Sequence, residues 1–124
     1  MILKNEIPIL EYDDSSPEVL APDHGLGGLR LPEKCLFAFL GDVVHNYADS
    51  HEAEVAQELV TVSHIIKVYV LHEAGEDICL VQSPIGAAAA SSVLDSLVCC
   101  GCRKIIATGS CGVLADIEEN AFLV

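Results

Sequence analysis

The sequence predicts an α/β fold in which helices flank a mixed, mostly parallel β-sheet. Short apolar runs such as residues 35–40 (CLFAFL) and 104–107 (KIIA) have the length of buried strands. An alanine-rich stretch that favours helix lies between two such runs. The resulting order, β-α-β-β-α-β, is typical of a largely parallel sheet covered by helices.

The first part of the chain is expected to be irregular. Proline and glycine recur through residues 1–33, and no helical or strand periodicity persists there. This N-terminal arm has room for one short strand near Ile7–Leu10. Order is expected to begin at Lys34, and the first strand, residues 35–40, should end at Gly41 and Asp42.

The remaining elements follow from periodicity and turn residues. A helix is predicted over Asn46–Leu59, and Asp49 and Glu52 would act as a capping box if the helix starts late. A long β-branched strand should follow over residues 60–73, then a turn at 74–77 and a strand at 78–82 that pairs with it as a hairpin. The second helix should start near Ala87 and end at Gly101. Strands are then expected over residues 104–107 and 120–124.

Composition narrows the classes of partner. The 124 residues fit one domain, and a hydrophobic fraction of 52% with a mean hydropathy of +0.46 predicts a dense core. With 19 acidic and 6 basic residues the net charge is −13, which argues against a nucleic acid or an anionic membrane as partner. No secretory signal is visible and no apolar run approaches the roughly 20 residues of a membrane span, so a cytoplasmic location is expected.

The six cysteines are interpreted as reduced, small core residues. Their neighbours are apolar, and a chain without a secretory signal keeps its thiols reduced. Cys99, Cys100 and Cys102 resemble a metal cluster superficially, but they lack the paired C-x2-C spacing that zinc sites favour. No metal site and no bound cofactor are therefore expected.

Three glycine-containing loops follow predicted strands, at residues 41–45, 83–86 and 108–112. Parallel strands would bring their carboxyl ends, and so all three loops, to one edge of the sheet, where open α/β folds bind ligands. Glycine lets the backbone approach a ligand, and free N–H groups at a helix start attract anions. Each loop alone is ordinary turn chemistry, but three in succession indicate a binding edge.

The segments FAFLGD and ICLVQSPIGAAAASSVLDSLVCCGCRKIIATGSCGVLADIEENAFLV resemble the front half of the nucleoside phosphorylase superfamily, which contains purine nucleoside and uridine phosphorylases and also nucleosidases. The resemblance covers residues 35–124 and does not extend into the arm. It divides the chain into the arm, 1–33, and the front part of a phosphorylase-like α/β domain, 34–124. It implies that this is the front portion of a larger domain.

The resemblance also assigns candidate site residues. Gly41 and Asp42 match the start of a Gly-Asp-Pro-x-Arg phosphate loop, and Gly86 matches the second glycine of a Gly-x-Gly loop. Both arginines that the family's motifs expect in this half are missing, because His45 and Ala107 stand in their places. His45 is then either a weaker, pH-dependent cation or a plain surface residue of the helix. The phosphate and ribose contacts implied are Gly41, Asp42, His45, Gly86, Thr108, Gly109, Ser110 and Gly112.

The implied activity is phosphorolysis of the N-glycosidic bond of nucleosides, a pentosyl transfer with inorganic phosphate as co-substrate. The expected partners are a nucleoside and phosphate, and the family implies a homo-oligomer. Since the family's ribose, base and catalytic residues lie in its back half, 124 residues acting alone are expected to be inactive, and no catalytic residue is assigned. A nucleosidase-type hydrolase, or a non-catalytic module for anion or nucleoside binding or for assembly, remains open as an alternative.

Overall fold

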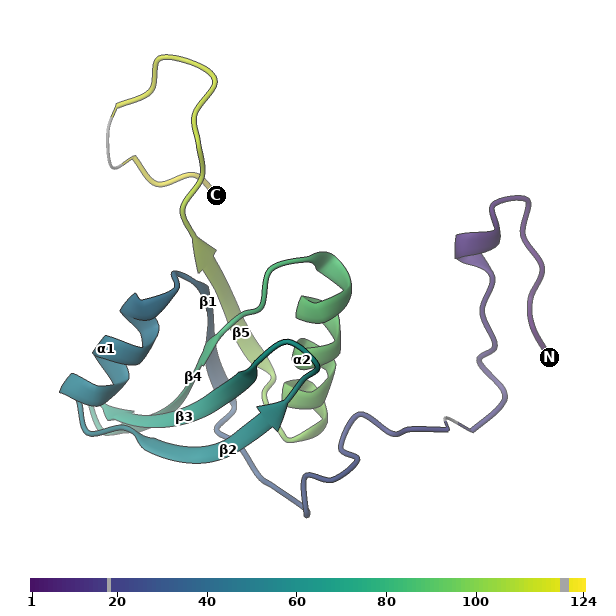
Figure 1. Cartoon of the computed structure of the whole chain (residues 1–124), viewed down its shortest axis with the longest axis horizontal. Coiled ribbons are helices and arrows are strands. Elements are labelled where there is room, and N and C mark those ends of the chain that lie inside the picture. Colours follow the sequence, from purple (N-terminus) through teal and green to yellow (C-terminus); the bar gives the residue numbers. More distant parts are fainter. Residues whose placement is uncertain (18, 119–120) are drawn as a thin grey trace.

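The computed structural model describes residues 1–17, 19–118 and 121–124. Five strands and two α-helices form the domain, and one short 3-10 helix lies in the arm (Figure 1). In chain order they are η1 (Pro8–Leu10), β1 (Lys34–Phe39), α1 (Asp42–Ser50), β2 (Glu54–Val60), β3 (Ile65–Glu73), β4 (Glu76–Gln82), α2 (Ala87–Cys99) and β5 (Lys104–Gly109).

The strands form one mixed sheet with the spatial order β2-β3-β4-β1-β5. β1 lies between β4 and β5 and pairs with both in parallel, while β2-β3 and β3-β4 are antiparallel. The predicted α/β class with a mixed sheet and flanking helices is therefore confirmed. The parallel half, β4-β1-β5, is the half in which three strands share a carboxyl edge.

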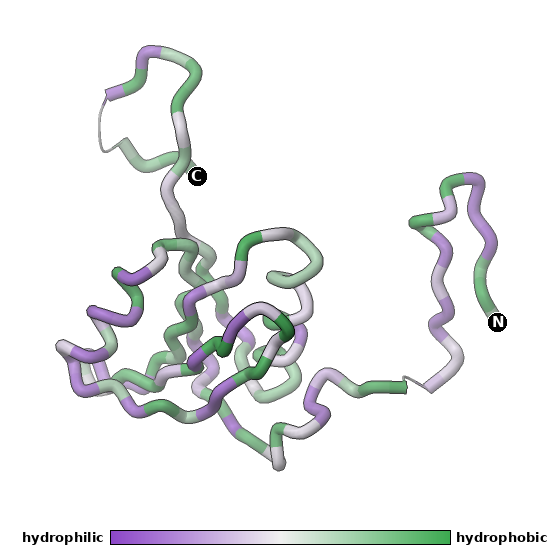
Figure 2. The backbone as a smooth tube through the Cα atoms, viewed as in Figure 1, coloured by the Kyte–Doolittle hydropathy of each residue, from purple (hydrophilic) through white to green (hydrophobic). Residues whose placement is uncertain are grey.

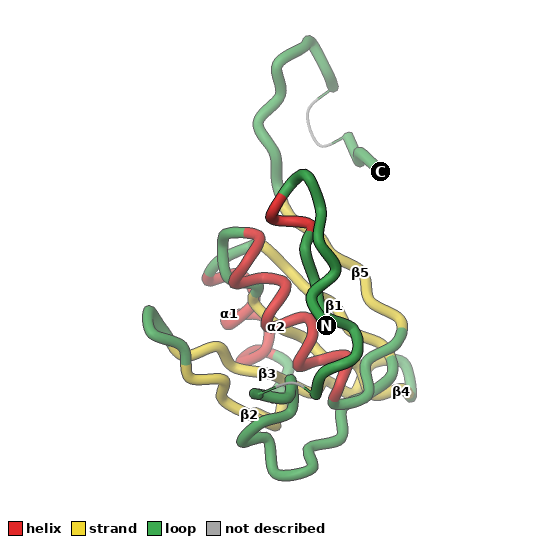
Figure 3. Tube along the Cα trace, turned by 90° about the vertical axis from the view of Figure 1, so that its right-hand side faces the viewer, coloured by secondary structure: helices red, strands yellow, loops and turns green. Residues whose placement is uncertain are grey.

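One helix covers each face of the sheet, so two core clusters form (Figure 1; Figure 3 gives the view at right angles). On one face, Val93 and Leu97 of α2 pack against odd-numbered residues of β1, such as Phe37. On the other face, Val44 and Ala48 of α1 pack against the remaining positions, such as Ala38. Successive side chains of β1 therefore point to opposite faces of the sheet, as in any strand, and both faces are buried.

The predicted helix 46–59 is wrong in its second half. The helix α1 begins and ends earlier, and residues 54–60 form the edge strand β2. Glu52 adopts a left-handed φ of 52°, the Glu52 N–H donates to the Asp49 carbonyl, and the Ala53 N–H donates to the Ala48 carbonyl at 2.9 Å. This is a Schellman ending, which normally has glycine at the left-handed position, so a glutamate there could not be recognised as a helix end from the sequence. Asp49 and Glu52 consequently lie at the end of a helix and form no capping box.

Three further predictions on strands need correction. Residues 61–64 are a turn between β2 and β3, closed by the Thr61 N–H and hydroxyl donating to the His64 carbonyl at 3.0 and 2.6 Å, so the predicted strand 60–73 is shortened. In the arm, Pro8 begins a 3-10 turn over the segment expected as a strand. Of the predicted strand 120–124, residue 120 lies outside the described residues, and residues 121–124 form no strand because no neighbouring strand pairs with them.

The hairpin and the second helix are confirmed. β3 and β4 pair in register up to Glu73 opposite Glu76, and the two residues between them, Ala74 and Gly75, have positive φ values of 51° and 82°. Such a pair of left-handed residues matches the twist of a two-residue hairpin. α2 ends at Cys99, and Gly101 follows with a φ of 124°, a conformation that glycine adopts without strain.

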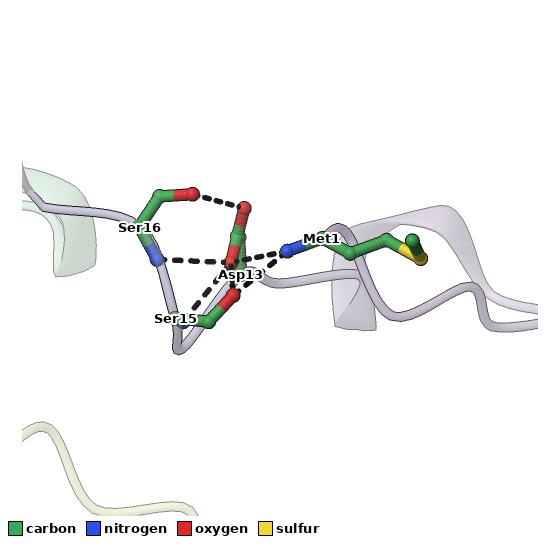
Figure 4. Close-up of polar contacts among 4 residues, drawn as sticks. All are labelled: Met1, Asp13, Ser15 and Ser16. Atoms are coloured by element: carbon green, nitrogen blue, oxygen red, sulfur yellow. Dashed lines mark hydrogen bonds and ion pairs between the residues drawn. The ribbon is translucent and has the colours of Figure 1, made fainter.

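The arm extends away from the sheet, and Figure 4 shows the contacts that fold its first residues. The Asp13 carboxylate accepts hydrogen bonds from the hydroxyl of Ser16, the backbone and hydroxyl of Ser15, and the Met1 ammonium at 3.0 Å. These donors hold the pKa of Asp13 well below its usual range. Near the domain the arm docks, since the Leu31 N–H donates to the Cys100 carbonyl at 2.9 Å and the Leu31 side chain is buried.

Hydrophobic residues are concentrated in the strands and in α2, and they also occur along the segment after β5 (Figure 2). In that segment the side chains of Leu114 and Phe122 are fully exposed. Within the described residues, no helix has both the length and the apolar character to cross a membrane.

Candidate phosphate-binding edge

The carboxyl ends of β1, β4 and β5 meet at one edge of the sheet. Phe39 of β1 lies opposite Gly109 of β5, and Ala38 lies opposite Gln82 of β4. The Ser83 N–H continues this ladder by donating to the Ala38 carbonyl at 2.7 Å. The three loops predicted to share an edge therefore leave the sheet side by side, because their strands are parallel and in register.

The first loop passes directly into α1. Gly41 is the residue before the helix, with a φ of 58°, no side chain caps the helix start, and a Cβ at Gly41 would meet nothing within 4 Å. The Val44 N–H donates to the Gly41 carbonyl at 3.1 Å, and the other N–H groups of a helix start favour an anion. Asp42, the first helical residue, places a carboxylate at the same point. That carboxylate stabilises the helix but opposes a phosphate electrostatically.

The second loop is tied firmly to β1. The Ser83 side chain is buried and its hydroxyl donates to the Pro84 carbonyl at 3.1 Å. The Gln82 amide donates to the Ser83 carbonyl at 3.0 Å, while its oxygen accepts from the Leu40 N–H. Gly86, with a φ of 104°, then begins α2, again with no side-chain cap and open space around its Cα. A second uncapped helix start therefore stands on the same edge.

The third loop follows β5. Thr108 and Gly109 are the last residues of the strand, and a Cβ at Gly109 would lie 3.2 Å from the Cβ of Phe39, so the absence of a side chain permits the close approach of β1. Ser110 follows at once and is exposed. Gly112 lies further along the segment that leads away from the sheet (Figure 1). The structure thus brings Gly41, Gly86 and Gly109 to one edge but carries Gly112 outward.

His45 lies on the second turn of α1, half-buried over β3. Its Nδ1 is 2.9 Å from the hydroxyl of Tyr69, and the two rings meet edge to face at a centroid distance of 5.9 Å. Tyr69 is buried, and this burial, together with the carboxylates of Asp49 and Glu58, raises the pKa of its hydroxyl. The contact leaves Nε2 as the imidazole nitrogen that another group can engage.

Tyr69 was missed by sequence reasoning. It lies 24 residues beyond His45, in a strand whose alternation indicates only a core position. Of the two interpretations that the sequence left open for His45, neither anticipated an imidazole anchored in this way. The contact exists because α1 crosses the face of β3 on which Tyr69 lies.

Apart from Lys67 of β3, the basic residues of the domain lie away from this edge. Arg103 donates from its Nη1 to the carbonyls of Val98 and Cys102, at the amino end of β5. Lys34 and Lys104, each the first residue of a strand, pair with Glu76 and Glu33. On β3 Lys67 precedes Val68, the partner of Val81 near the end of β4, and it lies in register with Glu58. The sequence motif lacks its arginines, and the fold brings no described arginine in their place.

The comparisons with known proteins bear on this edge. A family model described as the phosphorylase superfamily matches residues 34–124. No curated protein and no solved structure gave a significant match. The matched range begins at the first residue of β1 and includes all three loops.

Proposed function

The chain belongs to the phosphorylase superfamily, and on this premise we propose that its carboxyl edge binds phosphate and ribose for the phosphorolysis of nucleosides. The observation that carries the proposal is the convergence of Gly41, Gly86 and Gly109 at the ends of three adjacent parallel strands. Two of these glycines begin helices that no side chain caps. Uncapped helix starts supply oriented N–H donors to an anion.

The reaction sets what this edge must do. An oxygen of phosphate forms a bond to the anomeric carbon, the N-glycosidic bond breaks, and the base leaves with the bonding electrons and takes up a proton. The transition state carries positive charge on the ribose, so positioning of phosphate beside it provides much of the rate. The backbone donors at Gly41 and Gly86 and the hydroxyls of Thr108 and Ser110 suit that task.

His45 is proposed as the cation of the phosphate site. It stands where the family's first loop carries an arginine, and Tyr69 holds its Nδ1, which orients the ring. An imidazolium forms fewer hydrogen bonds than a guanidinium and is charged only when protonated.

A second candidate function is hydrolysis of nucleosides by water, as in nucleosidases. The observation that favours it is the replacement of both expected arginines by His45 and Ala107. A site with less positive charge holds phosphate less tightly, and water is the alternative nucleophile. A third alternative is a module that binds an anion or a nucleoside without reaction.

The test is calorimetric titration of the 124-residue chain with inorganic phosphate, ribose 1-phosphate and the nucleosides inosine and uridine. Phosphorolysis predicts binding of phosphate and ribose 1-phosphate, with His45→Ala weakening phosphate about 10-fold, the value of one charge-assisted hydrogen bond. Ser63→Ala, in the β2-β3 turn, is the matched control and should leave binding unchanged. Nucleoside binding without phosphate binding would favour the hydrolase, and no binding of any ligand would refute each of these functions.

A further inference from the structure

Three buried thiols meet inside the domain, and none of them belongs to the proposed phosphate-binding edge. They belong to Cys35 of β1, Cys79 of β4 and Cys102 of the turn between α2 and β5. Their sulfur atoms all lie within 4.8 Å of one another. The three residues are 3%, 0% and 0% exposed, so the cluster is enclosed by the core.

The fold explains why three distant cysteines meet. Cys35 and Cys79 are direct partners on adjacent parallel strands, so their side chains leave the sheet on the same face. α2 covers that face through Leu97. Cys102 is brought to the same point because its N–H donates to the Leu97 carbonyl at 3.0 Å. Two strands and one turn thus each contribute a thiol.

Cysteine is a common small core residue, and Cys100, also buried, packs in the same core without joining the group. Cys35, Cys79 and Cys102 differ from it because they direct three sulfur atoms to one enclosed point. Thiolate sulfur is a ligand that soft metal ions prefer. The enclosure and the convergence of three sulfurs therefore indicate a place where a soft cation can complete the cluster.

We propose that Cys35, Cys79 and Cys102 form a three-sulfur site for a soft metal ion, of which Cu(I) fits best. Metal–sulfur bonds of about 2.3 Å place three ligand sulfurs about 4 Å apart, so the cluster needs only a small contraction. Within the described part of the chain, no histidine or carboxylate joins the group. Zn²⁺ requires a fourth ligand, whereas Cu(I) is soft and accepts three thiolates. Each thiol that binds releases its proton to solvent, and no electron is transferred.

The test uses the whole chain, reduced and without oxygen, in competition with a chromophoric Cu(I) chelator. One equivalent of Cu(I) should move to the protein, with release of protons that a weakly buffered solution reports. Cys102→Ala and Cys35→Ala should each weaken Cu(I) binding by more than about 100-fold, since even outer-shell changes at metal sites cost about 10–100-fold. The matched controls are Cys99→Ser and Cys111→Ser, which should leave the affinity unchanged because neither residue belongs to the cluster.

X-ray absorption of the loaded wild-type chain gives a measurement that needs no variant. Three sulfur neighbours at about 2.3 Å are expected around copper. Circular dichroism of each alanine variant shows whether it has folded, and an unfolded variant is replaced by the corresponding serine. Failure of the folded wild type to take Cu(I) from the chelator, a first shell of nitrogen or oxygen, or loss of binding in the Cys99 or Cys111 control would each overturn the proposal.

Discussion

The two ends of the parallel strands β4, β1 and β5 are built in opposite ways. At the amino end the α2–β5 turn is packed tightly, since a Cβ at Gly101 would lie 3.0 Å from the Leu31 carbonyl oxygen. At the carboxyl end, a Cβ at Gly41 or Gly86 would meet nothing within 4 Å. At the carboxyl end only Gly109 serves close packing, against Phe39, while Gly41 and Gly86 leave space. The amino end is closed and the carboxyl end is open to a ligand.

Charge follows the same division. At the amino end Lys34 pairs with Glu76, Lys104 pairs with Glu33 at 3.0 Å, and Arg103 donates to backbone carbonyls. The carboxyl end has His45 and its contact with Tyr69. The ion pairs of Lys34 and Lys104 and the hydrogen bonds of Arg103 therefore lie at the closed end, whereas the open end offers backbone donors. Substitutions at the two ends should separate these contributions.

The largest expected effect is on the closed side, at Leu97. Its side chain is 1% exposed and its carbonyl holds Cys102 in place. Leu97→Ala should lower the free energy of unfolding by about 2–5 kcal/mol through the lost burial and the cavity that remains. Urea unfolding measures this loss. The control is Val98→Ala, a substitution of the neighbouring exposed residue, which should lower the free energy of unfolding by less than about 1 kcal/mol. Equal losses in the two variants would contradict the packing described for α2.

Glycine substitutions compare the packed amino end with the exposed segment after β5. Gly101→Ala forces an unfavourable φ of 124° and a contact with the Leu31 backbone, and should cost about 1–3 kcal/mol. Gly112→Ala, where φ is not positive and no atom lies within 4 Å of the added Cβ, should be nearly neutral. Urea midpoints of the two variants give the difference. A neutral Gly101→Ala would mean that the arm does not dock at Leu31.

A smaller effect is expected from the Tyr69 hydroxyl. Tyr69→Phe removes the contact with His45 Nδ1 while keeping the buried ring, and should lower the free energy of unfolding by about 0.5–1.5 kcal/mol. Tyr47→Phe is the matched control, because its exposed hydroxyl makes a long contact of 3.4 Å to Glu73. Urea unfolding of both variants is the measurement. A loss confined to Tyr47→Phe would show that Tyr69 does not anchor His45.

The smallest effect concerns the exposed pair Lys34–Glu76. Hydrogen bonding to Lys34 lowers the pKa of Glu76 below its ordinary value of 4.5. The pair therefore stabilises the folded chain above that unfolded-state pKa, and the contribution disappears as the pH falls through the lower folded-state pKa. Urea midpoints of the wild type and Glu76→Gln should differ slightly near neutral pH and converge in acid. High salt should reduce the difference, and Glu6→Gln in the arm should show none.

The sequence predicted the elements whose signals are local. The alanine run of α2 with Gly101 beyond it, the two-residue turn at Ala74 and Gly75, and the apolar run of β1 all specify their structures over a few residues. Residues 54–60 were misassigned because Glu52 ends α1 in a conformation that normally indicates glycine. The strand β2 then forms through its pairing with β3, a long-range contact that periodicity does not reveal.

The same distinction between local signals and long-range contacts applies to the candidate sites. The glycine loops and the absent arginines could be read from the sequence alone, because parallel strands necessarily carry their following loops to one edge. The contact of His45 with Tyr69 and the meeting of Cys35, Cys79 and Cys102 were decided by tertiary structure. The residues of these two contacts are at least 23 positions apart in the sequence. They come together only when the strand register and the helix packing are set, and no local sequence pattern encodes that register.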